Sequence, residues 1–255
     1  MRVVFMGKHK RSAVRALDWL VPREVDVAAV VAPESDESAH EHQRLDLAAA
    51  RHGLALTSEA DLYADPPGDV DVVVSFLFWN LIREPLISLA RVGCLNFHPA
   101  PLPDFRGVGG YNVAVLEGLR SWGVSCHFVD EQFDTGDLVE VERFVIDHET
   151  ETAFSLDLLS QRHLLGLFER VLERVLGGEE LPRSPQGEGR YVSRAEFEQL
   201  RVVREGDDLP RKLRAFWYPP WPGAVMDVDG QRLTLVDEGL LDDVAAAYRA
   251  AGRFP

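Results

Sequence analysis

Residues 70–77 read Val-Asp-Val-Val-Val-Ser-Phe-Leu, and residues 94–97 read Cys-Leu-Asn-Phe. Both stretches are short and mostly apolar, and Val72, Val73 and Val74 follow one another without a polar interruption. A strand of this kind is typical of a parallel sheet that helices cover on both faces. We therefore expect these two strands to lie in the sheet of an α/β fold.

Segments on either side continue the same pattern. Apolar runs predict further strands at 3–6, 25–31, 54–57, 125–129 and 138–146. Helical spacing of apolar residues predicts helices at 12–21, 45–52, 84–90, 108–118 and 152–176, with Ser12 as the N-cap of the first. Strands that alternate with helices indicate a doubly wound, mainly parallel, Rossmann-like sheet.

The composition changes after about residue 178, which predicts a division of the chain. We expect one main domain at 1–180, a Pro-, Gly- and Ser-rich linker at 181–190, and a small C-terminal α+β subdomain at 191–255. Within the last segment, residues 224–236 predict a hairpin that turns at Asp229-Gly230, and residues 241–250 predict a short helix.

Composition and charge narrow the class of protein. The 255 residues are 46% hydrophobic and 27% charged, with a formal net charge of -15, which disfavours a surface that holds nucleic-acid phosphates. The cysteines, Cys94 and Cys126, lie in apolar runs and are expected to be buried, inert thiols. The N-terminus resembles no cleavable leader and no apolar run could span a bilayer, so we expect a cytoplasmic protein without a membrane partner.

The strand at 94–97 leads into a second informative stretch, Asn-Phe-His-Pro-Ala-Pro-Leu-Pro-Asp-Phe-Arg-Gly at 96–107. Asn96 and His98 are two residues apart, so in a strand their side chains point to the same face. They also stand at the carboxyl end of that strand, where open α/β sheets bind ligands. The prolines that follow forbid a helix and stiffen the exit loop.

A carboxylate in a later turn completes the candidate site. Asp134 precedes Thr135-Gly136 between two predicted strands and could lean over the same pocket. An amide and an imidazole can stabilise an oxyanion, and a carboxylate can support the imidazole or move a proton, which suits acyl transfer to an amine. Taken singly, Asn-x-His and Asp-x-Gly are more often structural.

His40 and His42 lack a third ligand with metal-like spacing, so no metal site is predicted.

These residues carry a family resemblance. Residues 96–107 resemble the Asn-x-His-Pro-x-Leu-Leu-Pro-x-Tyr/Trp-Arg-Gly signature of the enzymes that use 10-formyltetrahydrofolate, and 133–139 (Phe-Asp-Thr-Gly-Asp-Leu-Val) resemble their second signature. The sequence departs from the pattern at Ala100 and Pro101. The resemblance implies a cis Leu102-Pro103 bond and a formyl group carried by folate. It also implies catalytic roles for Asn96 and His98, which would stabilise the oxyanion, and for Asp134, which would assist proton transfer.

The resemblance extends to binding residues. Residues 75–82 resemble the loop that holds the pterin in these enzymes, so Phe78, Trp79 and Leu81 are predicted cofactor contacts. The alternative is that they are core aromatic and aliphatic side chains at a strand end. Predicted substrate contacts are Arg106, Gly107, Tyr111 and Trp217, although the aromatic residues near Trp217 could equally form a small core.

The resemblance does not identify the amine that accepts the formyl group. Residues 191–255 carry nine Lys and Arg against eleven Asp and Glu, and they are too few for a full tRNA-binding barrel, so methionyl-tRNA is disfavoured. This tail resembles that of sugar N-formyltransferases, which implies a nucleotide-linked amino sugar as substrate. Another small amine, such as an amino acid or a natural-product intermediate, and a non-catalytic folate-binding module stay as alternatives. The oligomeric state is open and includes a homodimer.

Overall fold

A computed structural model describes residues 1–34 and 40–250. The chain forms two compact units whose segments alternate along the sequence. The first unit comprises Met1–Arg106, Gly123–Arg143 and Ser160–Arg190, and the second comprises Gly107–Trp122, Phe144–Leu159 and Tyr191–Pro255. The division of function between the predicted segments 1–180 and 191–255 stays a prediction.

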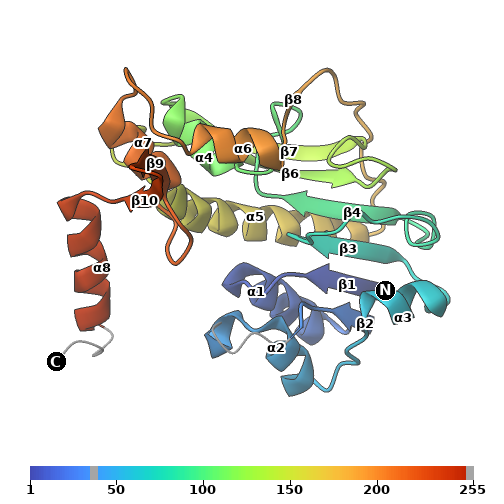
Figure 1. Ribbon diagram of the computed structural model, residues 1–255. Helices are drawn as coiled ribbons and strands as arrows, with labels where there is room; N and C mark the ends of the chain where they lie inside the picture. The colour runs from blue at the N-terminus through green and yellow to red at the C-terminus, as the bar shows by residue number, and fades with distance from the viewer. Residues whose placement is uncertain (35–39, 251–255) are drawn as a thin grey trace. The chain divides into compact units, whose positions relative to one another are not determined.

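A six-stranded sheet organises the first unit (Figure 1). Its strands, in spatial order, are β2 (Asp26–Val31), β1 (Arg2–Gly7), β3 (Val72–Phe76), β4 (Gly93–His98), β6 (Ser121–Phe128) and β7 (Leu138–Val145). The pairs β1–β2, β1–β3 and β3–β4 are parallel, whereas β4 and β6 are antiparallel. The predicted mainly parallel sheet is therefore confirmed.

Helices α1 (Arg11–Leu20), α2 (Leu45–Arg51) and α3 (Glu59–Ala64) also belong to this unit, together with the short 3-10 turns η1 (Val21–Arg23) and η2 (Glu41–Gln43). The long helix α5 (Ala153–Leu176) places the buried Phe168 against Phe5, Phe76 and Phe97 of three neighbouring strands, at centroid distances of 6.4, 5.6 and 5.1 Å. One face of the sheet thus packs on α5 through aromatic rings.

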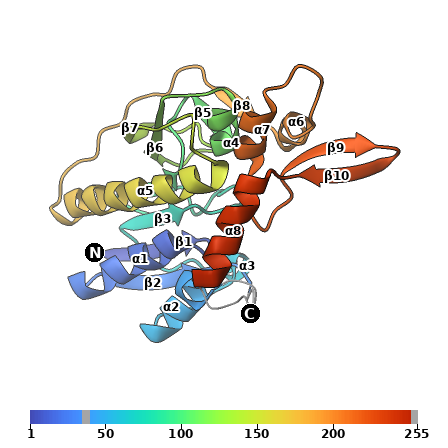
Figure 2. The same cartoon turned by 90° about the vertical axis from the view of Figure 1, so that its left-hand side faces the viewer.

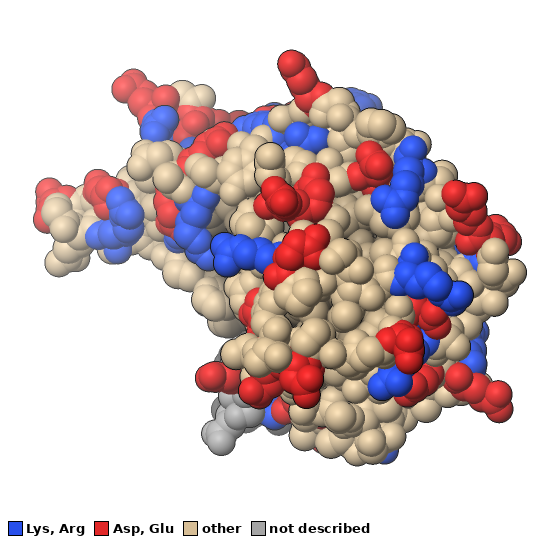
Figure 3. Space-filling model, turned by 90° about the vertical axis from the view of Figure 1, so that its right-hand side faces the viewer, with Lys and Arg blue, Asp and Glu red and all other residues tan. Residues whose placement is uncertain are grey.

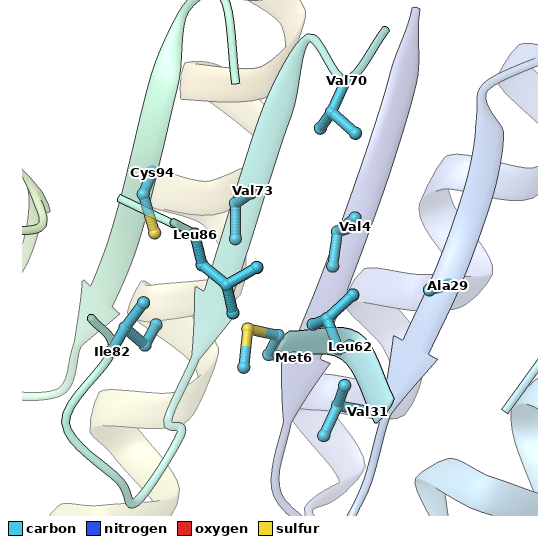
Figure 4. Close-up of a cluster of buried hydrophobic side chains, with 10 residues drawn as sticks. All are labelled: Val4, Met6, Ala29, Val31, Leu62, Val70, Val73, Ile82, Leu86 and Cys94. Atoms are coloured by element: carbon cyan, nitrogen blue, oxygen red, sulfur yellow. The ribbon is translucent and has the colours of Figure 1, made fainter. Parts of the chain in front are cut away.

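The opposite face of the sheet carries a second core (Figure 4). Val4, Met6, Val73 and Cys94 alternate in their strands with residues of the α5-facing set, as the period of two requires. They pack against residues from α3 and from the loop after β3, and the whole cluster is Val4, Met6, Ala29, Val31, Leu62, Val70, Val73, Ile82, Leu86 and Cys94. Burial raises the pKa of the thiols of Cys94 and Cys126.

The second unit contains α4 (Gly110–Leu116), α6 (Arg194–Leu200), α7 (Leu209–Phe216), α8 (Glu238–Ala250) and the hairpin of β9 (Ala224–Val228) and β10 (Gln231–Leu235), drawn as two adjacent arrows in Figure 2. The buried Asn112 amide of α4 donates to the Ala215 carbonyl of α7 at 2.8 Å. Asp229 and Gly230 both have positive φ, as a two-residue hairpin turn requires, so the predicted hairpin is confirmed. The short strands β5 (Phe105–Gly107) and β8 (Arg190–Val192) pair with each other.

Three local predictions were wrong. Residues 84–90 form turns instead of a helix, because Pro85 supplies no amide hydrogen and the segment is too short to be stable by itself. Residues 54–57 contribute only an isolated bridge between Val30 and Leu56. Ser12 does not cap α1, since Lys10 is the N-cap and the buried Ser12 hydroxyl donates to Gln161 at 2.8 Å.

Candidate active site

A row of three polar side chains crosses the sheet at the carboxyl end of β4. Ser75 of β3 is the register partner of Asn96 in β4, and Asn96 is the partner of His127 in β6. Partners in adjacent strands point to the same face, so the three side chains meet. Ser75 Oγ donates to Asn96 Oδ1 at 2.7 Å, and Asn96 Nδ2 lies 2.9 Å from His127 Nε2.

These contacts fix the orientation of the Asn96 amide. His127 Nδ1 lies 2.7 Å from the Phe128 carbonyl, which can only accept, so Nδ1 carries the proton and Nε2 accepts from Asn96. With Oδ1 held by Ser75, the second amide hydrogen of Asn96 is the one directed toward Asp134, whose Oδ1 lies 3.4 Å from Nδ2. The sheet therefore holds one N–H of Asn96 toward the mouth of the site.

His98 and Asp134 form a second pair on the same face. His98 Nδ1 lies 3.4 Å from Asp134 Oδ1, the oxygen that also faces Asn96. His98 Nε2 donates to the Phe105 carbonyl at 3.1 Å, which leaves Nδ1 as the nitrogen that can gain a proton. The structure thus brings Asn96 and His98, which strand parity places on one face, together around one oxygen of Asp134.

The electrostatic setting favours the neutral form of His98. Burial lowers the pKa of His98 below its ordinary value, and the facing Asp134 opposes this effect only in part. The side chains of His98 and Asp134 are only 12% and 11% exposed, so their interaction is weakly screened by water. A neutral imidazole beside a carboxylate can accept a proton, and the resulting imidazolium would have an acceptor at each nitrogen.

The turn that carries Asp134 is held in an uncommon conformation. Asp134 has φ +58°, in the left-handed region that non-glycine residues enter at a cost of about 1 kcal/mol. Two residues later, a Cβ atom on Gly136 would lie 1.9 Å from the Phe128 carbonyl oxygen. Only glycine fits there, so the backbone of the turn lies in direct contact with the end of β6.

A small hollow of about 40 Å³ opens beside Asn96 and Asp134. Phe78 and Leu81, two predicted cofactor contacts, line it together with Asn96, His127 and Asp134. The third, Trp79, packs on Phe78 with ring centroids 4.4 Å apart and is 38% exposed. Leu77, at the start of this loop, also has a positive φ (58°). Their binding role stays a prediction.

The predicted substrate residues are divided between the units. Arg106 belongs to the first unit, where its Nη2 donates to Gln186 Oε1 and to the Gly187 carbonyl. Gly107, Tyr111 and Trp217 belong to the second unit. There the Tyr111 ring lies 5.9 Å from that of Trp122, and the Trp217 carbonyl accepts from the amide of Phe154. Their substrate contacts stay predictions.

Sequence reasoning missed Ser75 and His127. The available signal was a polar side chain inside a strand: Ser75 follows three valines in β3, and His127 sits between Cys126 and Phe128 in β6. That signal becomes useful only when the register is known, because the three residues are far apart in the chain and the register makes them neighbours.

Residues 24–164, more than half of the chain, match the family model described as formyl transferase. The chain belongs to the formyl transferase family. It is therefore a formyl-transferring enzyme, and the resemblance found in its two signatures is confirmed.

Relatives of this formyltransferase are named for different acceptors. It is 30% identical, over 96% of its length and 81% of the relative, to a methionyl-tRNA formyltransferase of Lachnospira eligens. It is 33% identical, over 64% of its length and 63% of the relative, to a GDP-perosamine N-formyltransferase of Brucella melitensis. A solved 4-N formyltransferase from Francisella tularensis shares its fold, with a TM-score of 0.77 over 93% of this chain and 97% of that one at 19% identity.

Elsewhere, a hollow of about 400 Å³ lies in the second unit of the formyltransferase. Its most buried charge, Lys212, donates to Asp207 at 2.6 Å and to the Val202 carbonyl, so a local ion pair accounts for it.

Within residues 1–34 and 40–250, no group of three or more His, Cys, Asp or Glu side chains could hold a metal. No helix in the described part of the chain is long and apolar enough to cross a membrane.

Proposed function

We propose that this enzyme transfers the formyl group of 10-formyltetrahydrofolate to the amino group of a nucleotide-linked amino sugar. The observation that carries the chemistry is the convergence of Asn96 and His98 on Asp134 Oδ1, both at 3.4 Å, in a member of the formyl transferase family. The convergence supplies one directed N–H, one neutral imidazole and one carboxylate, and it involves no nucleophilic Ser or Cys. These groups suit direct attack by an amine.

The hollow beside the catalytic set fits the reacting end of the donor. It joins apolar Phe78, Leu81 and Ile82 to polar Asn96 and Asp134. At about 40 Å³ it is far below the ~300 Å³ of pockets that enclose a whole ligand, so most of the folate would lie outside it, with the exposed Trp79 ring available nearby. The folate supplies an activated formyl group on nitrogen.

The chain's own residues then perform three tasks. Asn96, held by Ser75 and His127, donates its N–H to the formyl oxygen as negative charge develops there. His98 Nδ1 and Asp134 together receive the proton that the attacking amine loses and return it to the leaving nitrogen. The buried setting of both side chains keeps bulk water from competing for that proton.

An amino sugar as acceptor is supported by the likeness to the GDP-perosamine N-formyltransferase, and the formal net charge of -15 disfavours the polyanionic tRNA alternative. Solved proteins of similar fold are described as an N-formyltransferase from Helicobacter canadensis in complex with folinic acid and dTDP-3-aminofucose, and as the sugar 3N-formyl transferase WlaRD. On the face shown in Figure 3, acidic and basic side chains are interspersed, without a continuous basic surface for a polyanion.

Methionyl-tRNA is the second candidate, because the relative that bears this name matches 96% of the chain. The experiment mixes the purified enzyme and 10-formyltetrahydrofolate with dTDP-, GDP- and UDP-linked amino sugars in parallel with methionyl-tRNA, and follows tetrahydrofolate release. We expect release with at least one amino sugar and none with tRNA. Release only with methionyl-tRNA would overturn the proposed substrate class, and release without any amine would indicate a hydrolase.

A further inference from the structure

Residues 181–190, predicted to be a linker, make specific contacts with both loops of the candidate site. The Ser184 backbone exchanges hydrogen bonds with Leu138, at 2.8 and 3.1 Å, beside the turn that carries Asp134. At the other end, a Cβ atom on Gly189 would lie 1.9 Å from the Pro103 carbonyl oxygen, so the two backbones touch. We call residues 184–189 the strap.

Gln186 lies at the centre of the strap and joins the two loops. Its Nε2 donates to the carbonyls of Asp134 at 3.1 Å and Gly136 at 2.6 Å. Its Oε1 accepts from Arg106 Nη2 at 2.8 Å. One side-chain amide thus uses both of its donor hydrogens on the Asp134 turn and its acceptor on the loop that follows His98.

We propose that Gln186 is a positioning residue for formyl transfer, acting through Asp134. The Asp134 backbone is left-handed, and the two carbonyls that Gln186 binds stand on either side of Thr135 in this turn. Holding both carbonyls fixes the direction of the Asp134 carboxylate toward His98 and Asn96. The inference rests on the proposed role of Asp134 in the reaction.

The side-chain amide of Gln186, and not only the attachment of the strap, positions the Asp134 turn. The backbone pairing of Ser184 with Leu138 and the packing of Gly189 on Pro103 hold the strap without the Gln186 side chain. A change at Gln186 therefore leaves the strap attached and frees the turn. Misplacement of a reacting group by about 1 Å lowers turnover by roughly a hundredfold.

The test compares two substitutions that separate the donor from the acceptor. Gln186→Glu keeps the acceptor for Arg106 but loses both N–H groups and places a carboxylate against two carbonyls, whereas Gln186→Met removes both functions at similar volume. We expect kcat to fall roughly ten- to a hundredfold in both, with the KM of the folate donor within threefold. Glu188→Gln, at an exposed position of the same strap, is the matched control and is expected to keep the parent kcat.

The same substitutions are repeated in an Asp134→Asn background, with unfolding midpoints measured for every protein. If Gln186 acts through Asp134, Gln186→Glu lowers the residual rate of Asp134→Asn by less than twofold. A normal kcat in Gln186→Glu, or equal losses with and without Asp134, would overturn the inference. Full activity of Asp134→Asn alone would instead overturn the proposed mechanism, so the two failures are distinguishable.

Discussion

At the residue scale, the site depends on one carboxylate oxygen. Asp134 Oδ1 lies within 3.4 Å of a nitrogen of both Asn96 and His98, and 3.7 Å from His127 Nε2. No other atom of the described site meets three nitrogen-bearing side chains in this way. The three partners keep further hydrogen bonds of their own when this carboxylate is changed.

We predict that Asp134→Asn and His98→Ala each lower kcat by at least roughly a hundredfold, because each removes a group that receives the amine proton and returns it to the leaving nitrogen. Folate affinity is expected to change only modestly, since the hollow keeps its apolar wall. Steady-state kinetics and equilibrium binding of a folate analogue measure the two quantities. Near-parent turnover in either folded variant would contradict the assignment.

The pH dependence of activity follows from the lowered pKa of His98. Only the neutral imidazole can accept the proton, so we expect the acid limb of kcat against pH to have its midpoint below about 6.5, the ordinary value for histidine. A midpoint above 6.5 would show that the charge of Asp134 raises the pKa of His98 more than burial lowers it.

The lowered pKa of His98 also makes the free energy of unfolding depend on pH. The native pKa of His98 lies below the unfolded one, so between these two values the unfolded chain binds more protons. The free energy of unfolding therefore decreases as pH falls below about 6.5 and is unaffected by this group above it. Urea unfolding at several pH values, compared with His98→Gln, isolates the contribution; a pH dependence that the substitution leaves unchanged would refute it.

At the element scale, three strands and two loops build the site. β3, β4 and β6 bring Ser75, Asn96 and His127 into one row, and the turn after β6 returns Asp134 over it. The antiparallel β6 places His127 opposite Asn96 and then runs toward the amino end of β4, so the turn after β6 must fold back to bring Asp134 to Asn96 and His98.

We predict that Gly136→Ala disturbs this turn, because the added methyl carbon would lie 1.9 Å from the Phe128 carbonyl oxygen. The free energy of unfolding is expected to fall by about 1–3 kcal/mol. Activity is expected to fall as well, since the turn carries Asp134. Gly68→Ala is the control, because Gly68 has no positive φ and a Cβ there would meet no atom within 4 Å. Equal stability of the two variants in urea would contradict the close approach.

At the scale of the whole molecule, the first unit separates packing from chemistry by sheet face. Phe5, Phe76 and Phe97 point to α5, whereas Asn96 and His98 share the face of the cluster in Figure 4. The aromatic rings of the three central strands thus pack on one face of the sheet, and the polar row of Ser75, Asn96 and His127 lies on the other.

We predict that Phe168→Ala lowers the free energy of unfolding by about 3–5 kcal/mol, because the fully buried ring contacts aromatic rings of three strands. Leu176→Ala, on the same helix but 39% exposed, is expected to change it by less than about 0.5 kcal/mol. Urea denaturation measures the free energy of unfolding of both variants. Similar decreases in the two would contradict a central packing role for Phe168.

The sequence by itself determined the α/β class, the parity of Asn96 and His98, the Asp134 turn and the family, because strand periodicity and motif spacing are local properties. The Leu102-Pro103 cis bond, implied by resemblance, is confirmed. Only the tertiary structure decided that Ser75 and His127 orient Asn96 and that Gln186 joins the two loops. These contacts join residues 21 to 80 positions apart, and no local pattern encodes the register and loop packing that bring them together.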